Sequence, residues 1–335
     1  MYRISKVATA SAFLVLSFFS VFTPAKAGKA GLKGTAKNAA VLWRDPGDIA
    51  SRDLFYGPGG KAHEPRGTFT FEKEDMDGTN PKFDVVDQDG VRWRVKMGVE
   101  AKPETTASRL VWAAGYFTNE DYFLPVLHVQ GMKHLRRGRS LVSADGTVHN
   151  VRLKRHLKDE KKIGTWSWAK NPFTGTPEWY RLRVLMAVMN NWDLKDMNNS
   201  IYLTPDSPPE ERYVVSDLGA SFGPTGLNSM QKGNPTAYCE SKWIKSTSAE
   251  FVDFNVPSGP AANFYLNFPE LARRLSLTWL GHQIPRADAR WVGNQLGRLS
   301  PGQLRDAFRA GGYSSQDIEQ LTTVVERRIS ELKRL

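Results

Sequence analysis

The stretch NWDLKDMNN, residues 191–199, runs directly into the short apolar stretch SIYL, residues 200–203. Residues 177–191 before it carry an apolar stripe at helical spacing, formed by Leu182, Leu185, Met186 and Met189. The sequence therefore predicts a core helix, a polar loop and a strand in direct succession. In the loop, Asp193 stands five residues before Asn198. At this spacing a carboxylate can accept a proton or orient a hydroxyl while the amide oxygen reaches a divalent cation such as Mg²⁺.

Two other segments carry polar residues at the ends of predicted strands. The segment RYVVSD, residues 212–217, places Asp217 at a strand end with a glycine two residues on, where its carboxylate would be a second metal ligand. Lys96 ends the third predicted strand, and a lysine there can hold a polyanion from a rigid support. Glu104 or Glu100, both shortly after that strand, can pair with Lys96 and keep its side chain extended.

From residue 67 onward, β-rich segments give way to helical ones. Residues 67–156 are predicted to form three strands, a helix that follows Pro103 and two more strands, with a tight turn at residues 88–90. Beyond about residue 163 the pattern is mainly helical, and it ends in helices expected at 268–283, 286–299, 301–310 and 315–332. The sequence predicts an α+β domain over residues 67–335, with a small lobe at 67–156 and a large lobe at 163–335.

The first 27 residues differ from the rest of the chain. Arg3 and Lys6 precede an apolar stretch, and residues 25–27, AKA, have the small-x-small pattern that signal peptidase accepts. We expect a signal peptide over residues 1–27 and an exported protein, periplasmic or extracellular, without a later transmembrane span. Residues 28–66 are rich in Gly, Pro and charge and are expected to form an irregular arm.

Composition excludes several function classes. The chain has 335 residues and a formal net charge of +11, so it is a basic protein that should be attracted to phosphates or anionic glycans and lipids. Its single cysteine, Cys239, excludes an intramolecular disulfide and a cysteine-rich metal site. The sequence has no H-E-x-x-H and no recognisable nucleic-acid-binding motif. The densest basic stretches, at 133–139 and 152–158, are interpreted as a solvated loop and strand face.

The order of the polar segments points to one superfamily. A strand lysine, a helix glutamate, an Asp-x-x-x-x-Asn loop and a strand-end Asp-x-Gly follow one another as they do in protein-kinase-like phosphotransferases. Over roughly residues 67–225 the chain resembles the atypical branch, similar to the phosphoinositide-kinase, HipA-type and secretory-pathway kinases. The resemblance implies a two-lobed fold, with a small antiparallel β lobe that holds one main helix and a larger, mainly helical lobe. It also implies ATP with Mg²⁺ or Mn²⁺ as cofactors.

The resemblance also implies roles for the small-lobe residues. Lys96 would contact the α- and β-phosphates of the nucleotide, with Glu104 as its ion-pair partner and Glu100 as the alternative. No G-x-G-x-x-G follows the first strand. Gly78 stands where a phosphate-covering turn would lie, and the other candidates for that task are Gly57, Gly59 and Gly60.

In the large lobe the resemblance implies the catalytic and metal-binding residues. Asp193 would be the catalytic carboxylate, and Asn198 and Asp217 would be metal ligands. Lys195 could neutralise charge on the transferring phosphoryl group. Leu194-Lys195 replaces the Arg-His pair of the relatives, and Leu218 replaces the Phe of Asp-Phe-Gly. The pair Asp196 and Asn199 in the same loop remains an alternative to Asp193 and Asn198.

The predicted reaction is transfer of the γ-phosphoryl group of ATP to a hydroxyl of a protein, glycan or lipid. A second hypothesis is a catalytically silent kinase-fold module that binds a partner in the cell envelope. A third is a structural envelope protein in which the order of motifs is coincidental.

Overall fold

The computed structural model describes residues 38–78, 80–191, 193–223, 233–255, 272 and 275–335. All of them belong to the unit of residues 38–335. The signal peptide expected over residues 1–27 lies outside the described residues, as do residues 28–37 of the expected arm and residues 268–271 and 273–274 of the helix expected over 268–283. In the described part of that expected helix, Thr278–Gly281 form a 3-10 turn.

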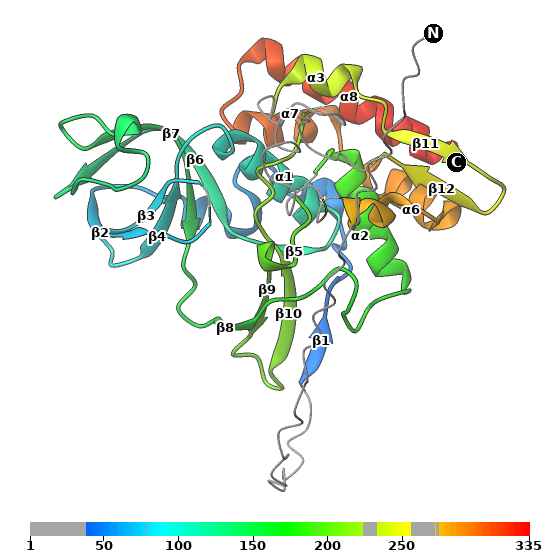
Figure 1. Cartoon of the computed structure of the whole chain (residues 1–335), viewed down its shortest axis with the longest axis horizontal. Helices are drawn as coiled ribbons and strands as arrows, with labels where there is room; N and C mark the ends of the chain where they lie inside the picture. Colours follow the sequence, from blue (N-terminus) through cyan, green and yellow to red (C-terminus); the bar gives the residue numbers. More distant parts are fainter. Residues whose placement is uncertain (1–37, 79, 192, 224–232, 256–271, 273–274) are drawn as a thin grey trace, which may run out of the picture. The chain divides into compact units, whose positions relative to one another are not determined.

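The small lobe is a closed five-stranded barrel (Figure 1). Around the barrel the strands follow in the order β2 (Phe69–Asp75), β3 (Lys82–Asp87), β4 (Arg92–Lys96), β7 (Thr147–Arg155) and β6 (Asp121–Gln130). Neighbouring strands are antiparallel, except that a parallel pairing of β2 with β6 closes the barrel. The predicted strands are confirmed, whereas the closure is a feature that the alternation of residues did not indicate.

Local sequence explains the barrel strands. Phe83, Val85, Trp93 and Val95 alternate with polar residues and are all buried inside the barrel. The predicted turn between β3 and β4 is confirmed, because Asp87 Oδ1 accepts hydrogen bonds from the backbone N–H groups of residues 89 and 91.

Helix α1 (Ala101–Ala113) follows β4 and is buried on almost every side. It begins two residues before Pro103, which the first turn of a helix tolerates because the N–H groups there have no intrahelical acceptor. Leu110 and Val111 in this helix are fully buried, and the short strand β5 (Phe117–Thr118) follows it.

The large lobe combines helices with two small sheets. Its helices are α2 (Pro177–Val188), α3 (Pro235–Glu240), α6 (Arg286–Leu296), α7 (Pro301–Ala310) and α8 (Ser315–Lys333). One sheet has the order β1 (Ala39–Val41), β10 (Glu210–Val215), β9 (Asn199–Leu203) and β8 (Lys161–Gly164), and β5 also pairs with β10. The other sheet contains β11 (Ile244–Thr247), β12 (Phe251–Phe254) and β13 (Ile284–Pro285).

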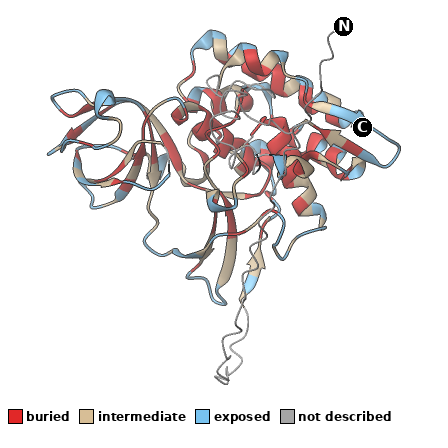
Figure 2. Cartoon of the chain, in the orientation of Figure 1, coloured by how far each residue is buried: buried red, intermediate tan, exposed pale blue. Residues whose placement is uncertain are grey.

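The predicted two-lobed α+β arrangement is confirmed, with one cluster of buried residues inside the barrel and a larger one that joins α1 to the helices of the large lobe (Figure 2). Strands β8, β11 and β12 and helix α3 were not predicted. Among the described residues, no helix is both long and apolar enough to cross a bilayer.

Residues 38–66, expected as an irregular arm, pack against the rest of the domain. Strand β1 pairs with β10, and three 3-10 turns follow it, at Ile49–Ser51, Gly57–Gly59 and Lys61–His63. Leu42, Ile49 and Leu54 are buried, and Gln303 on α7 donates its side-chain amide to three backbone carbonyls of residues 49–52. The segment is irregular, yet it is part of the core.

A buried arginine on α8 forms hydrogen bonds with the C-terminal end of α2. Arg328 is fully buried and donates to the Val188 carbonyl at 2.9 Å, to Asn190 Oδ1 at 2.7 Å and to Ser241 Oγ at 2.7 Å. Its guanidinium also lies 4.2 Å from the centre of the Tyr238 ring. No described acidic residue forms an ion pair with Arg328, so its charge is balanced by neutral oxygens and aromatic rings alone.

Arg328→Met should lower the free energy of unfolding by about 2–4 kcal/mol, because several buried acceptors would lose their donor. Urea denaturation followed by circular dichroism measures the loss. The matched control is Arg327→Met, the same change one residue earlier, where the side chain is half exposed. Equal stability of the two variants would contradict the role given to Arg328.

Candidate active site

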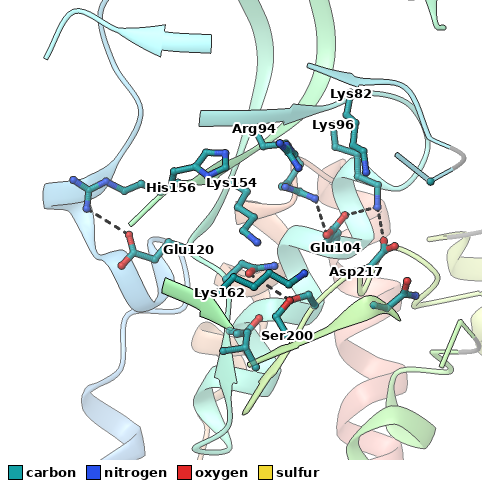
Figure 3. A pocket seen from close by; sticks show the side chains of 18 of the residues that line it. Lys82, Arg94, Lys96, Glu104, Glu120, Lys154, His156, Lys162, Ser200 and Asp217 are labelled. Carbon is teal, nitrogen blue, oxygen red and sulfur yellow. Dashed lines mark hydrogen bonds and ion pairs between the residues drawn. The ribbon is translucent and has the colours of Figure 1, made fainter. Parts of the chain in front are cut away.

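A cavity of about 780 Å³ lies between the barrel and the large lobe (Figure 3). Both lobes contribute to its wall: the β2–β3 turn, β3, β4, α1 and β7 on one side, and the 191–199 loop, β9 and the end of β10 on the other. Among the described residues its lining has more basic than acidic side chains: the eight basic ones are Lys82, Arg94, Lys96, Arg152, Lys154, Arg155, Lys162 and Lys195, against the six acidic ones Asp77, Glu104, Glu120, Glu160, Asp193 and Asp217. The cavity is therefore suited to an anionic ligand.

Lys96 at the end of β4 is the centre of a buried ion cluster. Its Nζ lies 2.7 Å from Glu100 Oε2, 2.9 Å from Glu104 Oε2 and 2.5 Å from Asp217 Oδ1. The sequence offered Glu104 and Glu100 as alternative partners of Lys96, and in the structure both of them pair with it. Figure 3 shows Lys96 reaching down from the barrel to Glu104 and Asp217, with Asp217 in the large lobe.

The charge of Lys96 depends on this cluster. Burial by itself would lower the pKa of Lys96, but the carboxylates of Glu104, Asp217 and Glu100 together raise it well above its usual range. The lysine is therefore fixed in its charged form, and its removal would leave the almost fully buried carboxylates of Glu100 and Glu104 without this cation.

The buried Arg152 binds the carboxylate oxygen of Glu104 that Lys96 does not contact. Arg152 on β7 donates to Glu104 Oε1 at 2.8 Å, and its Nε lies 3.6 Å from Asp121 Oδ1. Burial raises the pKa of Asp121 to about 6, although Arg152 opposes the shift. Glu104 is thereby held between two cations, Lys96 and Arg152, in a fixed orientation.

The 191–199 loop brings Asp193, Lys195 and Asn198 to the opposite wall of the cavity. Lys195 Nζ lies 3.1 Å from Asp193 Oδ1, and the side-chain amide of Asn198 donates to the backbone carbonyl of Asp193 at 2.9 Å. Asn191 Oδ1 accepts from the backbone N–H of Asp193 at 3.1 Å. These bonds fix the loop around Asp193. The amide nitrogen of Asn198 is used in one of them, and the amide oxygen of Asn198 accepts no hydrogen bond from any described residue.

The alternative pair in this loop lies elsewhere. Asp196 is exposed and accepts a hydrogen bond from the backbone N–H of Trp168 at 3.0 Å. Asn199 is buried and donates to the Trp166 carbonyl. Neither of these two side chains lines the cavity, whereas Asp193 and Asn198 both do.

Asp217 combines an unusual backbone with a partly open side chain. Its φ of +55° is left-handed, a conformation that aspartate tolerates better than most residues and that is common at functional sites. Two residues on, a Cβ at Gly219 would lie 2.6 Å from Glu100 Cβ, so only glycine allows this close approach. The side chain of Asp217 is 38% exposed, against 5% for Lys96.

The β2–β3 turn carries Gly78 to the cavity. Gly78 has a φ of +64° and lines the cavity, whereas Gly57, Gly59 and Gly60 do not. Arg137 holds the turn by donating to the backbone carbonyls of Gly78 and Asp75. Sequence reasoning missed Arg137, because nothing in the basic stretch 133–139 distinguishes it from its solvated neighbours.

Arg152 was missed for a similar reason. It falls in the second basic stretch, which was interpreted as a solvated face, yet it is buried against Glu104. On a barrel strand a residue between the core residues Val151 and Leu153 points away from the barrel core, so local alternation does not predict its burial; Arg152 is buried because it binds Glu104 of α1.

Comparison with known proteins finds similar chains among the solved structures. The sequence matches no protein-family model and no curated protein. Among solved structures, the chain is similar to the Helicobacter pylori proinflammatory kinase CtkA, with a TM-score of 0.44 and 12% identity over 81% of this chain and 98% of that one. It is also similar to a Golgi casein kinase, with a TM-score of 0.36 and 10% identity over 80% and 73% of the two chains. Both of these similar structures are kinases.

Asp84 should make the stability of the barrel depend on pH. It is 1% exposed, and Arg94 donates to its two oxygens at 2.8 and 3.0 Å. Burial alone would raise the pKa of Asp84, but His156 and Arg94 hold it well below its usual range. A depressed pKa stabilises the folded state above the unfolded value of about 4, and this contribution is lost as the pH falls below it.

The Asp84→Asn variant should lack this pH-dependent contribution to the free energy of unfolding. At pH 7 its free energy of unfolding should therefore be lower than that of the wild type. Urea denaturation at a series of pH values from 7 to 2.5 tests the expectation against Asp89→Asn, the same change at an exposed turn residue. The wild-type and Asp89→Asn curves should fall together at low pH, with the Asp84→Asn curve flatter. Three parallel curves would show that Asp84 is not responsible.

Proposed function

We propose that this protein is a kinase-like phosphotransferase that uses ATP and a divalent cation, Mg²⁺ or Mn²⁺, to phosphorylate a hydroxyl group. One observation carries the proposal. The Lys96–Glu104 ion pair, Asp193, Asn198 and Asp217 come from four separate segments, yet all line one cavity rich in basic side chains. This is the set of groups that phosphoryl transfer requires: cations for the phosphates, oxygen ligands for the metal and a carboxylate for the acceptor.

Asn198 and Asp217 fit a hard cation. Both offer oxygen ligands at the same cavity, the amide nitrogen of Asn198 is already used by the Asp193 carbonyl, and Asp217 is partly open to solvent. A divalent cation there would neutralise charge on the nucleotide phosphates. Binding of a cation by Asp217 would compete with its ion pair to Lys96, so the cluster offers Asp217 two alternative partners.

Asp193 suits the role of the carboxylate that orients the acceptor hydroxyl and accepts its proton. Its backbone is fixed by Asn191 and Asn198, and Lys195 lies beside its carboxylate. Lys195 would balance the negative charge that gathers at the transferring group. Met197 in the same loop is 72% exposed and also lines the cavity.

We further propose that the protein is exported and that its acceptor is a hydroxyl on a protein, glycan or lipid. The charged start, apolar stretch and AKA site within residues 1–27 support export. The competing hypothesis is a binding module of the same fold without turnover, and the nucleotide experiments below separate the two.

Nucleotide should stabilise the protein in a metal-dependent way. The unfolding midpoint of the wild type should rise with ATP and Mg²⁺ or Mn²⁺, because a ligand that binds only the folded state adds about 2.7 kcal/mol at a hundred times its Kd. Differential scanning fluorimetry should show no such rise for Asp217→Asn. The control is Asp206→Asn, the same change at an exposed acid that pairs with Arg212 outside the cavity. A wild type that is indifferent to millimolar nucleotide would favour the binding module.

Asp193→Asn should lower turnover by about 10²- to 10⁴-fold, the usual contribution of a positioned general base. Release of ADP from ATP and transfer of phosphate to the chain itself both measure turnover. The ATP-induced rise in the unfolding midpoint should persist, because the nucleotide contacts stay in place.

The matched control for this experiment is Asp196→Asn, which removes the other carboxylate of the loop and should keep turnover within a few-fold. The opposite result, with Asp196 essential and Asp193 dispensable, would reverse the assignment of the base.

A further inference from the structure

The ammonium of Lys96 is fully occupied. An ammonium has three N–H donors, and three carboxylate oxygens lie within 2.9 Å of Lys96 Nζ. Glu104 lies in the first turn of α1, and Glu100 is the residue directly before this helix. Both glutamates are almost completely buried. Even if Asp217 turned to a metal ion, two of the three donors of Lys96 would stay with Glu100 and Glu104.

A second lysine faces the same part of the cavity. Lys82 on β3 is the direct cross-strand partner of Lys96 on β4, and both line the cavity. Figure 3 shows the two side chains next to each other and running in the same direction. Lys82 therefore presents its ammonium beside the ion cluster.

Lys82 has no close acidic partner among the described residues. Its ion pair with Asp75 Oδ2 is long, at 3.9 Å, and that same oxygen lies 2.5 Å from Arg94 Nη1. The side chain of Lys82 is only 22% exposed. Burial is the main reason why the pKa of Lys82 is lowered, with Asp75 opposing the shift. A cation in this environment gains more from a bound anion than one that already holds three carboxylates.

Gly78, at the turn before Lys82, lines the same cavity as the Lys82 side chain. A Cβ at Gly78 would meet only Lys82 Nζ, at 3.6 Å, so the ammonium lies directly against the glycine of the turn. Arg137 donates a hydrogen bond to the backbone carbonyl of Gly78. A phosphate group at this point would contact the Lys82 ammonium and lie close to the backbone of the turn.

We propose that Lys82 is the lysine that binds the nucleotide phosphates, while Lys96 acts as a positioning residue that holds Glu100, Glu104 and Asp217. The inference rests on the proposed function and changes the assignment that the order of motifs implies, in which the strand-end lysine contacts the phosphates.

The test is isothermal titration of the full chain with AMP, ADP, ATP and inorganic tripolyphosphate in the presence of Mg²⁺. In the wild type, affinity should rise from AMP to ATP. Lys82→Gln should weaken binding of ATP and tripolyphosphate by about tenfold or more, the value of a hydrogen bond to a charged group, and leave AMP nearly unchanged. Lys82→Arg should restore most of the affinity.

Two further variants separate a specific contact from other effects. Lys73→Gln removes the same charge from an exposed position on the neighbouring strand β2, outside the cavity, and should bind ATP like the wild type. Lys96→Gln should lower the unfolding midpoint of the unliganded protein by several degrees, whereas Lys82→Gln should leave it nearly unchanged.

The outcomes are distinct. Tight binding of ATP by Lys82→Gln would overturn the inference and leave the proposed function intact. Binding of tripolyphosphate that depends on Lys82, without binding of ATP, would support the phosphate site and contradict the nucleotide. A wild type that binds neither probe would overturn both the inference and the proposed function.

Discussion

The contact between Lys96 and its three carboxylates is the interaction on which the site depends. It joins a barrel strand, the start of α1 and the loop after β10, so that one ammonium ties the small lobe to the large one. Charges removed from water are costly unless each one is paired, and here Arg152 and Asp121 continue the pairing behind Glu104. Lys96 and Arg152 are the two cations of this network, and loss of either would leave the nearly buried Glu104 with one cation instead of two.

Arg328 has a comparable role in the large lobe, but it is balanced differently. It binds neutral oxygens at the end of α2, directly before the loop that carries Asp193. The backbone N–H of Phe222, shortly after Asp217, donates to the Met189 carbonyl at the same helix end. The end of α2 thus fixes both polar segments of the large lobe relative to each other, and the side chains that face the cavity inherit their positions from a buried scaffold.

Much of this could be predicted from the sequence, and particular residues show why the rest could not. The strand that ends at Lys96 and the helix before Asp193 follow from local periodicity, and the order of motifs brought Glu104, Asn198 and Asp217 together. Arg137 and Arg152 were missed because burial of a cation depends on partners distant in sequence. The choice between Asp193 and Asp196 depended on which side of a single loop turn faces the cavity, and spacing alone does not determine that.

The pairing of β1 with β10 also bears on how the chain reaches its folded state. The strand at residues 39–41 lies beside residues 210–212, and the segment after it is held by Gln303 on α7. Contacts between such distant residues require closure of a long loop and form late. A chain made or delivered from its N-terminus must therefore keep the strand at residues 39–41 unpaired until residues 210–212 have emerged, and this leaves the strand open to wrong pairing or to capture by a chaperone in the meantime.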